Sequence, residues 1–207
     1  MKIILVLLAL SFSLIACKKE ETSVLCKPRF YFYDDKEYFL PEQKGEVWIK
    51  FNKPNITLDE VTEIISRYPN FTLNIPPTKI NFNEVALILN IPFSCQTFDK
   101  QLALLNTDSD ILSATPIFGS FMSKTSPFVV LRDEIIVKPD DSMSIEDFEN
   151  IVKAFNLEIV KLSITKSYLL RVPNIKTGYE ALEKANQINQ IKNIMYAEPN
   201  LLSGPNR

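Results

Sequence analysis

The side chains that could do chemistry in this chain are few. It has three cysteines, Cys17, Cys26 and Cys95, and no histidine. A Ser-His-Asp site needs an imidazole as its general base, so the sequence excludes that kind of catalysis. It also lacks Gly-x-Ser-x-Gly, the setting of another common serine nucleophile. We therefore expect this protein not to be an enzyme.

The residue types also argue against a metal or cofactor site. The sequence has neither histidine ligands nor closely spaced cysteine pairs. Its acidic clusters lie beside turn residues or a helix start, and none has the ligand spacing of an EF-hand loop. We expect solvated turn or cap residues in these clusters, with a calcium site as the alternative. The clusters are Asp34-Asp35, Asp108 with Asp110, and Asp140-Asp141.

Charge and composition narrow the class of partner. The 207 residues are 46% hydrophobic and 23% charged, with a net charge of −2, which is typical of a globular protein. The isoelectric point is about 5.4, and no basic stripe interrupts the sequence. We therefore expect no nucleic-acid partner.

The N-terminus has the pattern of a signal peptide. A lysine at position 2 precedes the apolar run "IILVLLALSFSLIA", which is too short to span a membrane comfortably. The end of this run, Leu14-Ile15-Ala16-Cys17, resembles the lipobox of bacterial lipoproteins. The resemblance implies a signal peptide of residues 1–16, lipidation of Cys17 with a fatty acid such as palmitate, and membrane attachment through that lipid. The alternatives are an ordinary secretory signal and an uncleaved anchor.

The residues after Cys17 bear on where the protein is exposed. Lys19, Glu20 and Glu21 resemble the surface-export tag of some Bacteroidetes lipoproteins, and a solvated spacer is the alternative. We expect a lipid-anchored protein of the bacterial cell envelope, at the outer membrane and exposed at the cell surface if the tag acts. In an oxidising compartment Cys26 and Cys95 can form a disulfide; two buried free thiols are the alternative.

Two stretches of the sequence repeat the same order of patterns. "GEVWIKF" (45–51) and "DEIIVKP" (133–139) predict strands, and a helix start follows each of them. Thr57 with Glu60 fits a capping box; Ser144 with Asp147 is a weaker version. The apolar stripes of the two predicted helices have the same spacing. They are Leu58, Val61, Ile64, Ile65 and Tyr68 in the first, and Ile145, Phe148, Ile151, Val152 and Phe155 in the second.

The rest of each repeat predicts strand, strand, helix and strand. The helices are expected near 97–105 and 177–191, the second opened by a capping box of Thr177 and Glu180. The terminal strands are "ILSATP" (111–116) and "IMYAEP" (194–199). This order predicts an α+β protein of two tandem ferredoxin-like (βαββαβ) domains, each an antiparallel sheet with helices on one face.

These patterns divide the chain into segments. The aromatic block "RFYFYDDKEYF" (29–39) is expected to add a strand or to cover the first core; a carbohydrate or peptide platform is the alternative. The predicted segments after the signal peptide are a lipidated tether and aromatic leader (17–44), domain 1 (45–118), a linker (119–132), domain 2 (133–200) and a tail (201–207).

The second domain resembles the N-terminal propeptide of subtilisin-like serine proteases, of the fervidolysin type. Its most specific elements are "IIVKP" (135–139), "YLLRV" (168–172) and "YAEPN" (196–200); Asn156 departs from the usual glycine. In that family the sheet packs on the protease, and the segment after the last strand lies extended in the active-site cleft. The residues that the resemblance assigns to such binding are Ala197, Glu198, Pro199, Asn200, Leu201, Leu202 and Ser203.

Two functions follow as hypotheses. In the first, a lipid-anchored, propeptide-like protein acts in trans as inhibitor or folding chaperone of a subtilisin-like serine protease. In the second, the doubled fold is a non-enzymatic binding or structural module of the cell envelope. The first predicts an exposed, extended tail with an accessible strand edge. The second predicts a tail that is folded back or covered.

Overall fold

A computed structural model describes residues 26–34, 36–74, 83–120 and 128–204. The expected signal peptide (1–16), the lipidation site Cys17, the tag at 19–21 and residues 205–207 of the tail lie outside the described residues. Part of the predicted linker, 121–127, lies outside them too.

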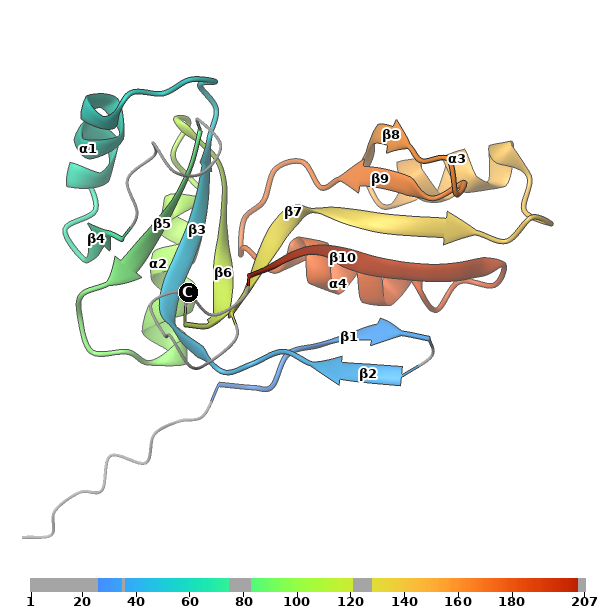
Figure 1. Cartoon of the computed structure of the whole chain (residues 1–207), viewed down its shortest axis with the longest axis horizontal. Helices are drawn as coiled ribbons and strands as arrows, with labels where there is room; N and C mark the ends of the chain where they lie inside the picture. The colour runs from blue at the N-terminus through green and yellow to red at the C-terminus, as the bar shows by residue number, and fades with distance from the viewer. Residues whose placement is uncertain (1–25, 35, 75–82, 121–127, 205–207) are drawn as a thin grey trace, which may run out of the picture.

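The chain folds as two ferredoxin-like units in tandem (Figure 1). In the first unit, residues 43–119, the strands lie side by side in the order β4-β5-β3-β6 and all neighbours are antiparallel. Its elements are β3 (Gln43–Phe51), α1 (Leu58–Ser66), β4 (Phe71–Leu73), β5 (Glu84–Leu89), α2 (Cys95–Leu105) and β6 (Ile111–Gly119).

The second unit, residues 128–204, repeats this arrangement with the order β8-β9-β7-β10. Since the first and third strands of each unit are central neighbours, both have the split βαβ order that the sequence predicts. Its elements are β7 (Phe128–Pro139), α3 (Ile145–Ala154), β8 (Glu158–Leu162), β9 (Tyr168–Arg171), α4 (Glu180–Ile188) and β10 (Ile194–Gly204).

Two of the three capping sites that the sequence predicts are confirmed. Thr57 and Glu60 form the full capping box of α1, and the Ser144 hydroxyl accepts a hydrogen bond from the Asp147 N–H at α3. Ser94, which was not among the predicted caps, caps α2 in the same way. The predicted box at Thr177 is wrong, because α4 begins at Glu180, whose carboxylate accepts the N–H groups of the preceding turn instead.

The apolar stripes face the core except at their first positions. Val61, Ile64 and Ile65 of α1 are buried, as are Phe148 and Val152 of α3. Leu58 and Ile145, which open the two stripes, are exposed instead. Each is the first residue of its helix, so the same deviation occurs in both units.

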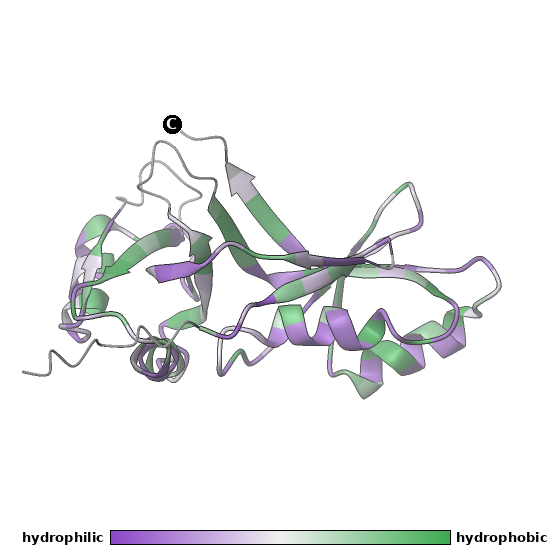
Figure 2. Ribbon diagram, turned by 90° about the horizontal axis from the view of Figure 1, so that it is seen from below, coloured by the Kyte–Doolittle hydropathy of each residue, from purple (hydrophilic) through white to green (hydrophobic). Residues whose placement is uncertain are grey.

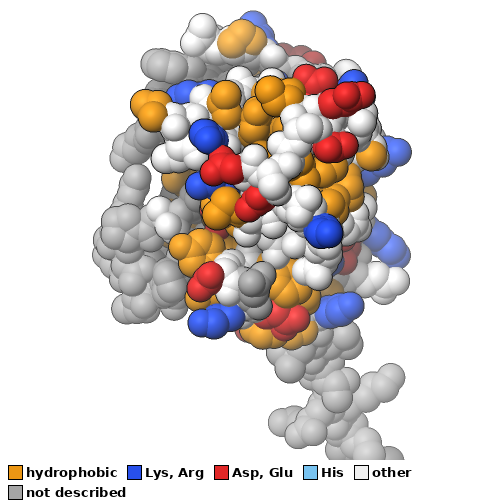
Figure 3. Space-filling model, turned by 90° about the vertical axis from the view of Figure 1, so that its right-hand side faces the viewer, with side chains coloured by type: hydrophobic (Ala, Val, Ile, Leu, Met, Phe, Trp, Pro, Cys, Tyr) orange, Lys and Arg blue, Asp and Glu red, His pale blue; other side chains and the backbone are white. Residues whose placement is uncertain are grey.

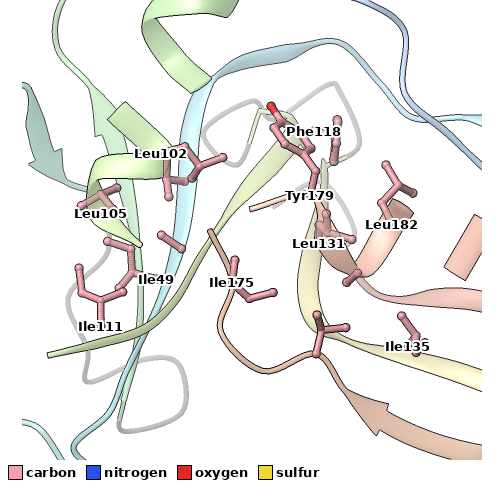
Figure 4. Close-up of a cluster of buried hydrophobic side chains, with 14 of the residues drawn as sticks. Ile49, Leu102, Leu105, Ile111, Phe118, Leu131, Ile135, Ile175, Tyr179 and Leu182 are labelled. Atoms are coloured by element: carbon pink, nitrogen blue, oxygen red, sulfur yellow. The ribbon is translucent and has the colours of Figure 1, made fainter. Parts of the chain in front are cut away.

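The two units share one sheet and one core. Ile117, Phe118 and Gly119 at the end of β6 pair with Val130, Val129 and Phe128 at the start of β7. A single cluster of buried side chains contains Ile49, Leu102 and Leu105 of the first unit and Leu131, Ile135 and Leu182 of the second (Figure 4). The two units therefore bury apolar surface together rather than as separate bodies.

The predicted linker at 119–132 is partly wrong. Residues 128–132 belong to β7, and Gly119 still belongs to β6. The run Phe128-Val129-Val130-Leu131 is apolar and contains two β-branched residues, and it pairs with β6 on one side and β10 on the other. Between two such neighbours an extended strand satisfies its backbone groups on both sides, which a surface linker would not.

Polar contacts also cross from one unit to the other. The Tyr179 hydroxyl accepts a hydrogen bond from Gln43 Nε2 at 2.8 Å and donates one to Asp99 at 2.9 Å. Burial raises the pKa of Tyr179, so its hydroxyl stays protonated as this donation requires. Arg132 donates to both carboxylate oxygens of Glu84, at 2.9 and 3.0 Å. These bonds fix the orientation of the second unit on the first.

Candidate binding surface

The residues that the propeptide resemblance assigns to binding lie in β10. Ala197, Glu198 and Pro199 are paired with Val137, Ile136 and Ile135 of β7. Ala197 and Pro199 point into the core under the helices, whereas Glu198 points to the opposite face of the sheet. The structure therefore divides this segment between core packing and an accessible surface.

The expected free tail is in part wrong. Leu201, Leu202 and Ser203 continue β10 and pair with Leu131, Val130 and Val129. Leu201 packs against the core, while Leu202 and Ser203 are exposed. The tail is thus held along β7 up to Gly204 because β7 extends further toward the first unit than the repeat pattern indicates. Insertion of this segment into a protease cleft would first require these pairs to break.

The outer edge of β10 is covered over part of its length. The hairpin β1 (Phe30–Tyr33) and β2 (Lys36–Phe39) lies along β10 and α4 (Figure 1). Asn186 of α4 accepts the Phe32 N–H at 3.2 Å and donates to the Phe30 carbonyl at 2.8 Å. The aromatic block therefore forms a hairpin against the second unit, which corrects the expectation that it covers the first core.

The base of the hairpin is fixed in two further ways. Cys26 and Cys95 form the expected disulfide, with their Cα atoms 5.4 Å apart, so the leader is tied to the start of α2. The Arg29 guanidinium lies 4.0 Å from the centre of the Tyr179 ring and 3.6 Å from the Glu183 carboxylate. Both units therefore hold the segment that precedes the fold.

The face of the second unit opposite its helices is open. Figure 2 shows α3 and α4 on one side of this sheet and no helix on the other. Because side chains alternate along a strand, the neighbours of the buried residues Ile135, Val137, Leu170 and Ala197 project from the open side. We call this surface the helix-free face. It comprises Glu134, Ile136, Lys138, Glu158, Lys161, Leu169, Arg171, Tyr196, Glu198 and Asn200.

Cross-strand pairing arranges the helix-free face in three rows, of which the shortest is Tyr196 beside Lys138. One row has an apolar centre, Leu169 beside Ile136, with a charged residue at each end, Lys161 and Glu198. A second long row is polar: Glu158 lies 4.0 Å from Arg171, and Asn200 donates to the Glu134 carboxylate at 2.8 Å. An apolar centre inside a charged rim is the usual composition of a protein-binding surface.

The electrostatics at one end of this face are perturbed by burial. Desolvation raises the pKa of the Glu198 carboxyl above its ordinary value. Burial is also the main reason why the pKa of Tyr31 in the hairpin is raised, and the negative charge of Glu198 adds to it. Glu198 thus lies where β10 and the hairpin meet, and its charged form is disfavoured there.

The acidic clusters behave as turn and ion-pair residues. Asp108 and Asp110 both pair with Arg67, at 3.2 and 2.6 Å, and the Asp140 carboxylate accepts the Ser142 N–H at 2.8 Å. Among the described residues, which omit Asp35, no group of three or more His, Cys, Asp or Glu side chains is placed to hold a metal ion. In the described part of the chain, these acidic residues therefore serve in turns and ion pairs.

The expectation that the sequence holds no nucleophile motif is wrong at one place. Ser163 and Lys166 form a Ser-x-x-Lys sequence in the turn between β8 and β9. The Lys166 ammonium pairs with Asp141 at 2.8 Å, which raises its pKa, whereas a general base needs a lowered one. The Ser163 hydroxyl bonds Thr165 and Ser167 instead. The motif has the residue types of a nucleophile and base but not their geometry.

Comparison with known proteins does not assign a family. No family model matches the chain, and no curated protein matches it. The acetolactate synthase small subunit of Thermotoga maritima is similar over 78% of this chain and 96% of its own, with 14% identity and a TM-score of 0.27. The two RNA recognition domains of Sex-lethal from Drosophila melanogaster are similar over 75% and 98%, with 12% identity and a TM-score of 0.26. Neither score is high enough for the likeness to bear on function.

One structural finding concerns membrane-spanning helices. None of the helices in the described part of the chain has the length and apolar character needed to cross a membrane.

Proposed function

We propose that this protein is a non-enzymatic binding module of the bacterial cell envelope, anchored through lipid on Cys17, and that the helix-free face binds a partner protein. The observation that carries the proposal is the apolar centre of this face. Ile136 and Leu169 are half-buried neighbours on adjacent strands, and their exposed atoms lie between charged side chains. Such a surface gains from removal of apolar area while its rim selects the partner.

The way β10 is held supports this proposal over cleft insertion. A structural role for the end of the chain predicts a tail that is folded back, and Leu201–Gly204 are paired with β7. A module that binds through its sheet face needs β10 in this position, because Glu198 and Asn200 form part of that face.

The proposal is tested by site-specific photocrosslinking from the full chain in its native host. A photoreactive residue at Leu169 is expected to give one discrete crosslinked product. The matched control is the same residue at Glu149, which is exposed on α3 on the other side of the sheet. Equal labelling from the two positions, or none from Leu169, would contradict binding through the helix-free face.

A subtilisin-like serine protease is the second candidate partner. The segment 133–200 has the βαββαβ order expected of a propeptide, and Leu202 and Ser203 are exposed and extended at the end of β10. Inhibition in trans would use the same sheet face as the larger contact, with the tail entering the cleft by strand addition.

Residual protease activity and binding to the protease, measured together, separate the two candidates. The full chain, a Leu169→Glu variant and a chain that ends at Asn200 are each incubated with subtilisin-like proteases at micromolar concentration. Inhibition that is lost on shortening the chain supports the protease inhibitor. Binding that survives shortening, is lost in Leu169→Glu and leaves the protease active supports a binding module alone.

A further inference from the structure

The strand β8 ends the sheet of the second unit. It pairs with β9 on one side, and on its other side no strand is paired with it among the described residues. All five of its side chains are exposed. An unpaired edge strand presents backbone N–H and C=O groups that can pair with another strand.

The exposed side chains of β8 are unusually apolar for a free edge. Ile159 is 49% exposed, Val160 43% and Leu162 54%. Ile164, just beyond the strand, and Ile145 at the start of α3 are exposed as well. Figure 3 shows apolar side chains gathering over this end of the molecule, between acidic and basic ones. Burial of these side chains would stabilise an association through this edge.

A bulge in β8 places two opposite charges on one face. Ile159 pairs with Leu170 and Lys161 with Leu169, so Val160 is an extra residue between them. Glu158 is opposite Arg171, so Glu158 and Lys161 both lie on the helix-free face although they are three positions apart. In a regular strand, with its period of two, they would lie on opposite faces.

We propose that β8 pairs with β8 of a second copy of this chain, antiparallel and about a two-fold axis. In the register that places Ile159 opposite the partner's Val160, Glu158 lies opposite the partner's Lys161. Residues directly opposite in an antiparallel pair share a face, and the bulge provides that condition here. The symmetry forms this charge pair twice, and the apolar pair twice between them.

Charge complementarity of β8 with itself is what selects a second copy as the occupant. Bulges and charged side chains normally protect an edge strand from association, but here they match one another across a two-fold axis. The two sheets would then form one continuous sheet, with both helix-free faces on the same side. The pairing does not require a partner on that face, although Glu158 and Lys161 also belong to it, and it goes beyond the function proposed above.

Charge reversal tests the register. The mass of the full chain in a mild detergent is measured by light scattering for the wild type, Glu158→Lys, Lys161→Glu and the double variant. We expect a dimer for the wild type. Each single reversal places like charges opposite one another twice and should weaken dimerisation by about tenfold. The double variant restores both pairs and should dimerise like the wild type.

A matched reversal controls for net charge. Glu149→Lys changes an exposed residue of α3 by the same amount and should leave the dimer unchanged. Thermal unfolding of each variant shows whether the monomer still folds. The proposal would be overturned if the wild type were monomeric over a 100-fold range of concentration that reaches the highest soluble one. It would also be overturned if the double variant dimerised no more tightly than the single variants. In either event binding through the helix-free face could still be observed by crosslinking from Leu169.

Discussion

The side-chain oxygen of Asn189 accepts a hydrogen bond from the backbone N–H of Ala197 at 2.9 Å. Asn189 ends α4 and Ala197 lies eight residues later in β10. The first unit has the same contact at the same spacing, from the Ala114 N–H to Asn106 at 2.7 Å. Both alanines are fully buried. In both units the side-chain oxygen of the helix C-cap residue therefore gives a hydrogen-bond partner to a buried backbone N–H of the last strand. This pair of contacts is the most specific structural evidence for the repeat.

Replacement of Asn189 by alanine should lower the free energy of unfolding by about 1–3 kcal/mol, because it leaves the buried Ala197 N–H without a partner. Asn106→Ala should cost more, since Asn106 also donates to the carbonyl of Ala114 at 2.8 Å. Urea denaturation measures both. Gln187→Ala, an exposed change on α4, is the control and should have little effect. Equal stabilities of Asn189→Ala and this control would contradict the assignment.

Gly178→Ala should loosen the contact between the two units. Gly178 has a φ of +85°, and an added Cβ would lie 2.6 Å from Leu102 Cδ2 and 2.8 Å from the Ala114 carbonyl oxygen. We expect a loss of about 2–4 kcal/mol from the left-handed backbone and the clash together. Gly45→Ala is matched in backbone, with a φ of +79°, but its nearest neighbour would be 3.2 Å away. The difference between the two variants in thermal unfolding isolates the clash; no difference would show that the units are not packed here as described.

Reduction of the Cys26–Cys95 disulfide should destabilise the fold. The bond joins residues 69 positions apart, so it restricts the unfolded chain strongly. We expect a decrease in the free energy of unfolding of about 2–4 kcal/mol on adding a reductant. The double variant Cys26→Ser, Cys95→Ser should unfold like the reduced wild type and should not respond to the reductant. A wild type that unfolds identically with and without reductant would show that the bond is absent in solution.

Glu198→Gln should stabilise the protein at neutral pH and have little effect in acid. Burial raises the pKa of Glu198 in the folded state, so folding favours its protonated form. The stabilising contribution of this carboxyl is present below its unfolded pKa and is lost as the pH rises through its folded pKa. Glutamine resembles the protonated form at every pH, so the difference between variant and wild type should grow with pH across this interval.

The same variant gives a second measurement. The charge of Glu198 adds to the raised pKa of Tyr31, so Glu198→Gln should lower the pH at which Tyr31 ionises. Ultraviolet absorbance follows that titration. The Tyr33→Phe variant lacks the exposed tyrosine of the same hairpin, so repeating the titration in that background separates the Tyr31 signal from that of Tyr33. An unchanged Tyr31 titration would mean that the hairpin does not lie against β10.

Local patterns in the sequence were sufficient for the order of elements. The apolar stripes of α1 and α3, the capping residues at Thr57 and Ser144, and the β-branched runs of β3 and β7 depend on neighbours within a few residues. The α+β class and the two ferredoxin-like units follow from these patterns. The disulfide between Cys26 and Cys95 was one of two alternatives that the sequence left open, and the structure shows it. The propeptide resemblance, the lipid on Cys17 and the envelope location stay predictions.

Contacts between distant residues decided the rest. Residues 128–132 read as a linker by composition, but β6 and β10 supply strand partners on both sides and make them part of β7. In turn, β7 pairs with Leu201–Gly204, which by themselves have the composition of a free tail. Asn186 directs the aromatic hairpin to the second unit, from a position more than 150 residues further along the chain. Hydrogen-bond partners at such separations leave no local pattern, and so only the tertiary structure could place these segments.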